Sequence, residues 1–162
     1  ACEEADVTVS MHIGSSSSMP STSPDAPLAT SMSLYAQNAE GSFVDWVFSG
    51  TLTRFPKIKI AYAESQVGWM PFQMERMDSI AKGRIFGCIF DDLVGLKQRE
   101  DVGLEQILFE TDYPHSDGTF PHSRKVAHSM FAAVGMNAEE CRKVLRGNAI
   151  EAYGLHRFGI TE

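Results

Sequence analysis

The feature that most constrains the fold is a repeated alternation between strand-like and helix-like segments. Residues 7–12, 58–63, 85–90 and 106–111 are short apolar runs with β-branched or aromatic residues, and helix-like segments follow them. Strands that alternate with helices pair in parallel, with the helices packed on the sheet. The sequence therefore predicts an α/β protein with four parallel β/α units.

The intervening segments predict the helices. These are expected at about 40–49, from Pro71 onward, briefly after Asp91-Asp92, and at 123–134, 137–147 and 148–153. Met70, Met74, Met77 and Ala81 recur at helical spacing, and core packing is the ordinary reason for such a stripe. The Ser/Pro-rich stretch 14–31 is either a linker or a long functional loop.

Composition narrows the class of protein. The chain has 162 residues and a net charge of −7, without a Lys/Arg cluster, which argues against nucleic-acid binding. No apolar run approaches the roughly 18 residues that span a bilayer. Three scattered cysteines indicate reduced thiols, so we expect a cytoplasmic protein. The acidic start, without an initiator Met, suggests a chain that begins within a fold.

Two α/β architectures remain open. A flavodoxin-like sheet used for protein interaction needs about five such units, but His12-Ile13-Gly14-Ser15 after the first strand is no phosphate-binding loop. Four units make half of a (β/α)8 barrel, which typically needs about 250 residues. We therefore expect residues 1–162 to form a single partial barrel domain, the half with strands five to eight.

Polar residues stand at the strand ends, where parallel β/α proteins carry their functional groups. The first strand ends in His12, the second is followed by Glu64, the third by Asp91-Asp92 and the fourth by Asp112 and His115. Histidine, aspartate and glutamate are the usual metal ligands and general bases. Each also has a local structural explanation: a hydrogen-bonded His12, Glu64 as a helix N-cap and Asp112 as a turn cap.

Two motifs give a family resemblance. The segments 107–119 (ILFETDYPHSDGT) and 147–155 (GNAIEAYGL) closely resemble the end of amidohydrolase-related barrels, in the branch with aminocarboxymuconate semialdehyde decarboxylase and resorcylate decarboxylase. Residues 54–60 (RFPKIKI), 68–71 (GWMP) and 75–78 (ERMD) look like the same branch. The resemblance covers nearly the whole chain and implies the C-terminal half of a TIM-type barrel.

The resemblance also implies site residues. His12 matches the metal-binding His of the fifth strand, and Asp112 matches the metal-facing Asp of the eighth. Glu64 stands where the decarboxylases usually have a His on the sixth strand, so we expect it to act as an acid or base. His115 belongs to the matched motif, with a role in substrate contact or loop anchoring. His122 and His128 are expected at the surface.

The implied cofactor is one divalent metal ion, zinc or alternatively manganese, which would activate water or polarise a substrate carboxylate or carbonyl group. The family's first-strand HxH or ExH pair does not occur in this sequence. His12 and Asp112 alone are fewer than the three protein ligands of catalytic zinc sites. We therefore expect this chain by itself to bind the metal weakly or not at all and to be inactive.

The implied function is hydrolysis of a C–N or ester bond, or decarboxylation of a small carboxylic acid. The alternative is a non-catalytic binding module that keeps a half-barrel scaffold. The expected partners are a small-molecule substrate and either a second copy of the chain or the missing N-terminal half. Cut sheet edges favour such association, because they expose unpaired N–H and C=O groups.

Overall fold

The structure is a computed structural model that describes residues 1–16, 19–77, 83–115 and 118–161. Its strands are β1 (Val9–His12), β2 (Ile60–Ala63), β3 (Ile85–Ile89) and β4 (Ile107–Phe109). Its α-helices are α1 (Leu28–Ser33), α2 (Tyr35–Phe48), α3 (Thr51–Arg54), α4 (Met70–Arg76), α5 (Leu93–Lys97), α6 (Arg99–Val102), α7 (Ser123–Ala133), α8 (Ala138–Arg142) and α9 (Asn148–Tyr153). Shorter turns are η2 (Leu104–Gln106), η3 (Lys143–Gly147, a π-helical segment) and η4 (Leu155–Phe158).

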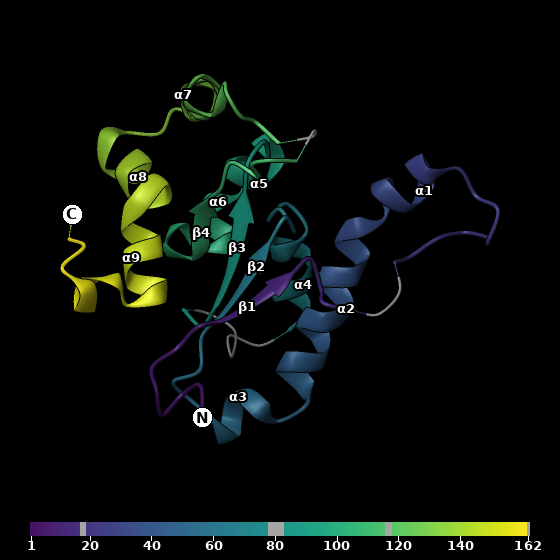
Figure 1. Cartoon of the computed structure of the whole chain (residues 1–162), viewed down its shortest axis with the longest axis horizontal. Coiled ribbons are helices and arrows are strands. Elements are labelled where there is room, and N and C mark those ends of the chain that lie inside the picture. The colour runs from purple at the N-terminus through teal and green to yellow at the C-terminus, as the bar shows by residue number, and fades with distance from the viewer. Residues whose placement is uncertain (17–18, 78–82, 116–117, 162) are drawn as a thin grey trace.

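The strands of this described part form one parallel sheet in the order β1-β2-β3-β4 (Figure 1). Val9 lies opposite Ile60, and Ile60 lies opposite Ile85 in the next pair. Each strand thus pairs with its successor in the chain, and the intervening helices make the crossovers that parallel pairing requires. This is the predicted arrangement of four parallel β/α units.

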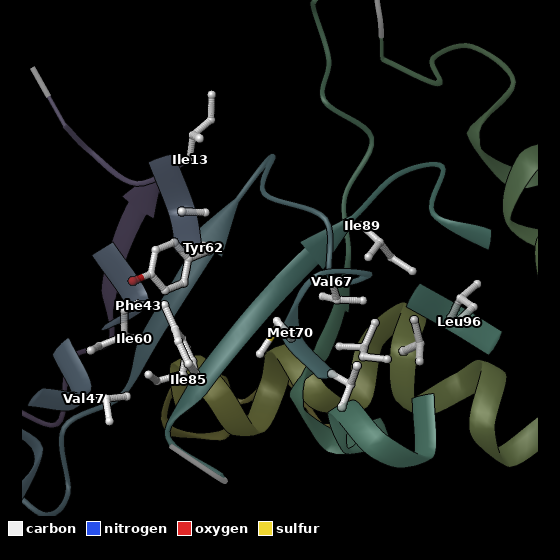
Figure 2. Close-up of a cluster of buried hydrophobic side chains, with 14 of the residues drawn as sticks. Ile13, Phe43, Val47, Ile60, Tyr62, Val67, Met70, Ile85, Ile89 and Leu96 are labelled. Atoms are coloured by element: carbon white, nitrogen blue, oxygen red, sulfur yellow. The ribbon is translucent and has the colours of Figure 1, made fainter. Parts of the chain in front are cut away.

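One face of the sheet, called the outer face here, carries the main hydrophobic core. Side chains of β1, β2 and β3 pack there against α2, α4, α5 and α7. Figure 2 shows ten labelled members of this cluster: Ile13, Phe43, Val47, Ile60, Tyr62, Val67, Met70, Ile85, Ile89 and Leu96. Phe43 and Trp69 meet edge to face, with ring centroids 5.6 Å apart. The helical periodicity of residues 40–49 therefore has its source in this packing.

The opposite face, called the inner face here, has a smaller core. Ala61, Phe86, Cys88 and Leu108 pack against Ala152 of α9. Ala149 and Tyr153 of α9 also pack against this smaller core, whereas Cys141 of α8 packs against the main core. Figure 1 shows α8 and α9 side by side at the C-terminal end of the chain. Polar contacts tie α9 to the first strand: the Thr8 hydroxyl donates to the Ala152 carbonyl oxygen, and Ser10 Oγ lies 3.1 Å from the Tyr153 hydroxyl.

Several boundaries differ from the predicted ones. The helix expected at 40–49 begins at Tyr35, and α1 occupies the end of the Ser/Pro-rich stretch that was expected to be a loop. Met70 is buried, and Met74 and Met77 pack against the same core, as the stripe predicted; Ala81 lies outside the described residues. Glu64 does not cap α4, whose N-cap is Trp69.

Gly87 lies at the centre of β3, although a glycine inside a strand usually weakens it. A Cβ atom at this position would lie 2.3 Å from Val67 Cγ1 and 3.2 Å from Met70 Sδ. The segment after β2 therefore packs directly on the backbone of β3. Glycine is required here because any side chain would displace that segment.

Two helices have side-chain caps at their N-termini. Asp92 accepts a hydrogen bond from the Gly95 N–H at the start of α5. Asn137 and Glu140 form a reciprocal capping box at the start of α8. The cysteines Cys2, Cys88 and Cys141 are all free thiols. Among the helices that the structure describes, none is long and apolar enough to cross a membrane.

Candidate functional site

The strand ends bring four predicted site residues together at the carboxyl edge of the sheet. His12 ends β1, Glu64 directly follows β2, and Asp112 and His115 lie in the loop after β4. Glu64 Oε1 lies 3.0 Å from His12 Nε2 and 3.7 Å from His115 Nδ1. His115 Nδ1 lies 2.8 Å from Asp112 Oδ1. Side chains from three strand exits therefore form one continuous polar cluster.

The cluster has a buried side and an open side. The Asp112 side chain is 6% exposed and that of Glu64 is 21% exposed. The two imidazoles are much more open, at 67% for His12 and 55% for His115. The carboxylates thus lie at the base of the site, and the histidines border the solvent from which a substrate would arrive.

Both carboxylate residues have unusual backbone conformations. Glu64 has φ of 58° and Asp112 has φ of 56°, in the left-handed region that non-glycine residues rarely adopt. Each such residue costs on the order of 1 kcal/mol, and residues of this kind concentrate at functional sites. The backbone after β2 and β4 is therefore bent sharply at the two residues whose carboxylates meet the histidines.

The loop after β4 holds its shape through local backbone bonds. The His115 N–H donates to the Asp112 carbonyl oxygen at 2.9 Å, and the Thr119 N–H donates to the Thr111 carbonyl oxygen at 3.1 Å. These bonds close a turn that directs His115 back toward the Asp112 carboxylate. Asp112 therefore has two roles: its carbonyl oxygen helps to close the turn after β4, and its carboxylate belongs to the polar cluster.

Glu110 also belongs to this site and was not predicted from the sequence. It follows β4, and its Oε1 accepts a hydrogen bond from the Glu64 N–H at 2.8 Å. The pKa of Glu110 is raised to about 7, mainly by burial, with a smaller contribution from the negative charges of Glu64 and Asp112; the hydrogen bond from the Glu64 N–H and the nearby His12 oppose this rise. The available signal was its place at the end of the fourth predicted strand, where parallel β/α proteins carry functional groups.

The third strand exit contributes a structural group instead. Asp92 is buried, and its carboxylate accepts hydrogen bonds from the N–H groups of Val67, Gly68 and Gly95. It thereby joins the segment after β2 to the start of α5. Asp91 is exposed, and so are His122 and His128, as was predicted for the two histidines.

The donor set fits a divalent metal ion. Within the described residues, Glu64, Asp112 and His115 each offer a ligand atom, and these atoms lie within 4.8 Å of one another. Carboxylate oxygens and imidazole nitrogens suit zinc and manganese. The sequence predicted His12 and Asp112 as ligands; this donor set contains Asp112, does not contain His12, and adds Glu64 and His115.

The comparisons with known proteins agree with this architecture. The family model for amidohydrolases matches residues 1–155. No curated protein sequence matches the chain. Among solved structures, the chain is similar to the 5-carboxyvanillate decarboxylase from Sphingomonas paucimobilis, with a TM-score of 0.73 at 16% identity, covering 94% of this chain and 50% of that one.

Two further solved structures share the fold. An amidohydrolase from Mycobacterium avium subsp. paratuberculosis K-10 has a TM-score of 0.69 at 20% identity, covering 93% of this chain and 42% of that one. A dihydroxybenzoic acid decarboxylase from Polaromonas sp. JS666, with bound manganese and the inhibitor 2-nitroresorcinol, has a TM-score of 0.65 at 17% identity. The match covers 96% of this chain and 52% of that one.

The chain spans about half the length of these structures. Its four parallel β/α units correspond to the C-terminal half of a (β/α)8 barrel, as the sequence predicted. The match of the family model over residues 1–155 shows that the chain belongs to the amidohydrolase family.

Proposed function

We propose that this chain is the C-terminal half of a divalent-metal-dependent enzyme that decarboxylates a small carboxylic acid or hydrolyses a C–N or ester bond. The observation that carries the proposal is the meeting of His12, Glu64, Asp112 and His115 at the carboxyl edge of the sheet. The same edge carries the active site in (β/α)8 enzymes generally. Because the chain spans about half of the solved structures, the proposal concerns the intact enzyme.

His12 and Asp112 are the proposed metal ligands. A neutral imidazole and an ionised carboxylate are donors that zinc and manganese both accept. Manganese is bound in the similar decarboxylase from Polaromonas, which makes it a specific alternative to zinc. A divalent ion supplies Lewis acidity toward a substrate carboxylate or carbonyl group.

Glu64 and His115 are the proposed acid/base groups. Asp112 Oδ1 lies 2.8 Å from His115 Nδ1, so an ionised Asp112 favours the tautomer that carries its proton on Nδ1. That arrangement leaves Nε2 of His115 as the basic nitrogen. Glu64 can exchange a proton directly with His12 across the 3.0 Å contact, whereas its 3.7 Å separation from His115 Nδ1 is too long for direct exchange.

Decarboxylation and hydrolysis make different demands on these residues. Decarboxylation needs a proton delivered to the carbon that loses CO2, while hydrolysis needs a proton removed from water and returned to the leaving group. Glu64 and His115 can hold a proton in either case. Decarboxylation is the first reaction to test, because several similar structures are decarboxylases of hydroxylated benzoic acids.

The test begins with the intact enzyme stripped of metal by a chelator and reloaded separately with zinc and with manganese. CO2 release from a panel of hydroxybenzoates is compared with hydrolysis of simple amides and esters. We expect the chelated enzyme to be inactive and one metal to restore one of the two activities. Full activity after verified metal removal would contradict the metal-dependent proposal. Metal binding without turnover on any substrate would favour the binding module.

We also propose that the chain associates through its sheet edges. In the described sheet order β1 and β4 are the edge strands, whereas the strands of a closed barrel have two neighbours each. The partner is the other half of the barrel or a second copy of this chain. Sedimentation of the chain alone should show self-association, and adding the other half should replace it by a one-to-one complex. A monomer at high concentration that ignores the other half would contradict this.

A further inference from the structure

Glu110 occupies a bridging position that the proposed reaction does not explain. Its own N–H donates to the Ile89 carbonyl oxygen at 2.9 Å and so extends the pairing of β4 with β3. Its side chain reaches instead to the N–H of Glu64, which follows β2. Because β3 lies between β2 and β4, the Glu110 carboxylate crosses the end of β3 and links two strand exits that do not pair.

The donor of this bond, the Glu64 N–H, belongs to a residue with a left-handed backbone conformation. Glu64 has φ of 58°, and the chain turns there from β2 into the segment that packs over Gly87. The Glu110 oxygen accepts the Glu64 backbone N–H, and a partly buried backbone N–H without an acceptor is unfavourable. The Glu110 contact therefore helps to offset the unfavourable backbone conformation of Glu64.

The orientation of the Glu64 carboxylate depends on that backbone. Its Oε1 lies 3.0 Å from His12 Nε2 and 3.7 Å from His115 Nδ1, so it joins the two histidines of the site. If the backbone of Glu64 relaxed to an ordinary conformation, the Cα–Cβ bond would point elsewhere. Both contacts would then be lost together.

We propose that Glu110 is a positioning residue, which holds the Glu64 backbone so that the Glu64 carboxylate stays between His12 and His115. Only the metal-binding test of this inference depends on the proposed function, because it assumes that the site binds a metal ion. The hydrogen bond itself is measured separately.

The first measurement follows the Glu64 amide by 15N–1H NMR in this 162-residue chain. The wild-type amide is expected to be shifted downfield and to exchange slowly with solvent, as a bond to a carboxylate requires. In Glu110→Ala both signatures should disappear, and in Glu110→Gln, which keeps an oxygen acceptor, slow exchange should persist. A wild-type Glu64 amide that exchanges as fast as exposed loop amides would overturn the proposal, even if Glu110→Ala fails to fold.

The second measurement places the same substitutions in the intact enzyme, titrates each variant with Mn²⁺ and follows binding by electron paramagnetic resonance. Glu110→Ala should weaken Mn²⁺ binding by about 10-fold or more, as loss of a group that orients a ligand does, while Glu110→Gln stays within about 3-fold of wild type. Asp91→Ala, which removes an exposed carboxylate after β3, is the matched control and should bind like wild type. Equal binding by wild type and Glu110→Ala would overturn the positioning role.

Failure of the proposed function gives a different pattern. If neither the wild-type chain nor the complete barrel binds Mn²⁺ or Zn²⁺, the proposed metal-dependent function is wrong. The amide measurement still decides the role of Glu110. A slow, downfield-shifted Glu64 amide that changes in Glu110→Ala supports the proposal in that case also.

Discussion

The outer face of the sheet and its carboxyl edge are built on opposite principles. On the outer face, apolar side chains of the strands and of α2, α4, α5 and α7 fill a continuous core. At the carboxyl edge, carboxylates and imidazoles meet within hydrogen-bonding distance, and two of the residues have left-handed backbones. The outer face stabilises the fold, and this stable fold holds the charged groups of the carboxyl edge close together.

This difference predicts that substitutions in the two regions have different effects on activity and on stability. Removing a group from the edge should damage chemistry and leave the fold, because like charges and strained backbones contribute little to stability. Removing a group from the outer face should damage the fold and affect chemistry only through it. Each of the following substitutions tests one side of this contrast.

The largest expected effect is that of Asp112→Asn in the intact enzyme. Loss of the carboxylate removes a proposed metal ligand and the partner of His115, so turnover should fall by roughly 10⁴-fold, about 5 kcal/mol on the barrier. The fold should persist, because asparagine tolerates the left-handed conformation that Asp112 adopts. Steady-state turnover and thermal unfolding are measured together, with Asp91→Asn as the control at an exposed carboxylate of the same edge. Near-normal turnover would remove Asp112 from the site.

Phe43→Ala tests the outer face and should cost about 3–5 kcal/mol of the free energy of unfolding, as truncation of a buried aromatic side chain does. Phe43 is 0% exposed and packs edge to face on Trp69. Urea denaturation of the chain measures the effect. Phe48→Ala, at a 70% exposed position of the same helix, is the control and should change stability by less than about 0.5 kcal/mol. Equal losses for the two variants would contradict the packing seen on this face.

The two regions also differ in how far the sequence predicts them. Helical spacing around Phe43 and the short apolar strands identify the outer face, because burial on one side of an element imposes a period on the residues. The grouping of His12, Glu64, Asp112 and His115 follows from a different rule, that carboxyl ends of parallel strands share one edge. Their chemical roles stay predictions.

Other parts of the site depend on contacts that no local pattern encodes. Glu110 interacts with a backbone N–H 46 positions earlier, and that N–H is available only because Glu64 takes a left-handed conformation. In sequence Glu110 is an acidic residue at the end of a strand, which is equally typical of a solvated position. The early start of α2 and the helix α1 were missed for a related reason, because their polar stretches give little apolar periodicity.

Gly87→Ala tests whether the outer face tolerates a single added methyl group. The new Cβ would lie 2.3 Å from Val67 Cγ1, so the segment after β2 must move, and we expect a loss of about 2–3 kcal/mol in urea denaturation. Gly41→Ala is the matched control, because a Cβ there has nothing within 4 Å and alanine favours the helix. That variant should be more stable by about 0.5–1 kcal/mol. An unchanged free energy of unfolding in Gly87→Ala would show that the segment after β2 packs loosely on β3.

The smallest expected effect concerns Tyr62, whose phenol is buried in the outer-face core. Burial raises the pKa of Tyr62 to about 12, against an ordinary value of 10.0, and its hydroxyl lies 3.0 Å from Ser42 Oγ. The folded state thus favours the protonated phenol more than the unfolded state does. The stabilisation by Tyr62 is complete below pH 10 and is lost as the pH rises toward about 12.

Tyr62→Phe removes this titration from the core. Its unfolding free energy should fall less between pH 10 and pH 12 than that of wild type, by about 1–2 kcal/mol, although it loses the bond to Ser42 at every pH. Urea denaturation over this range measures the difference, with Tyr113→Phe at a 65% exposed tyrosine as the control. The outer face then contributes an alkaline limit on stability from a side chain that is buried in the core and is not one of the carboxylates of the edge. Parallel pH profiles for wild type and Tyr62→Phe would instead place the alkaline limit elsewhere in the molecule.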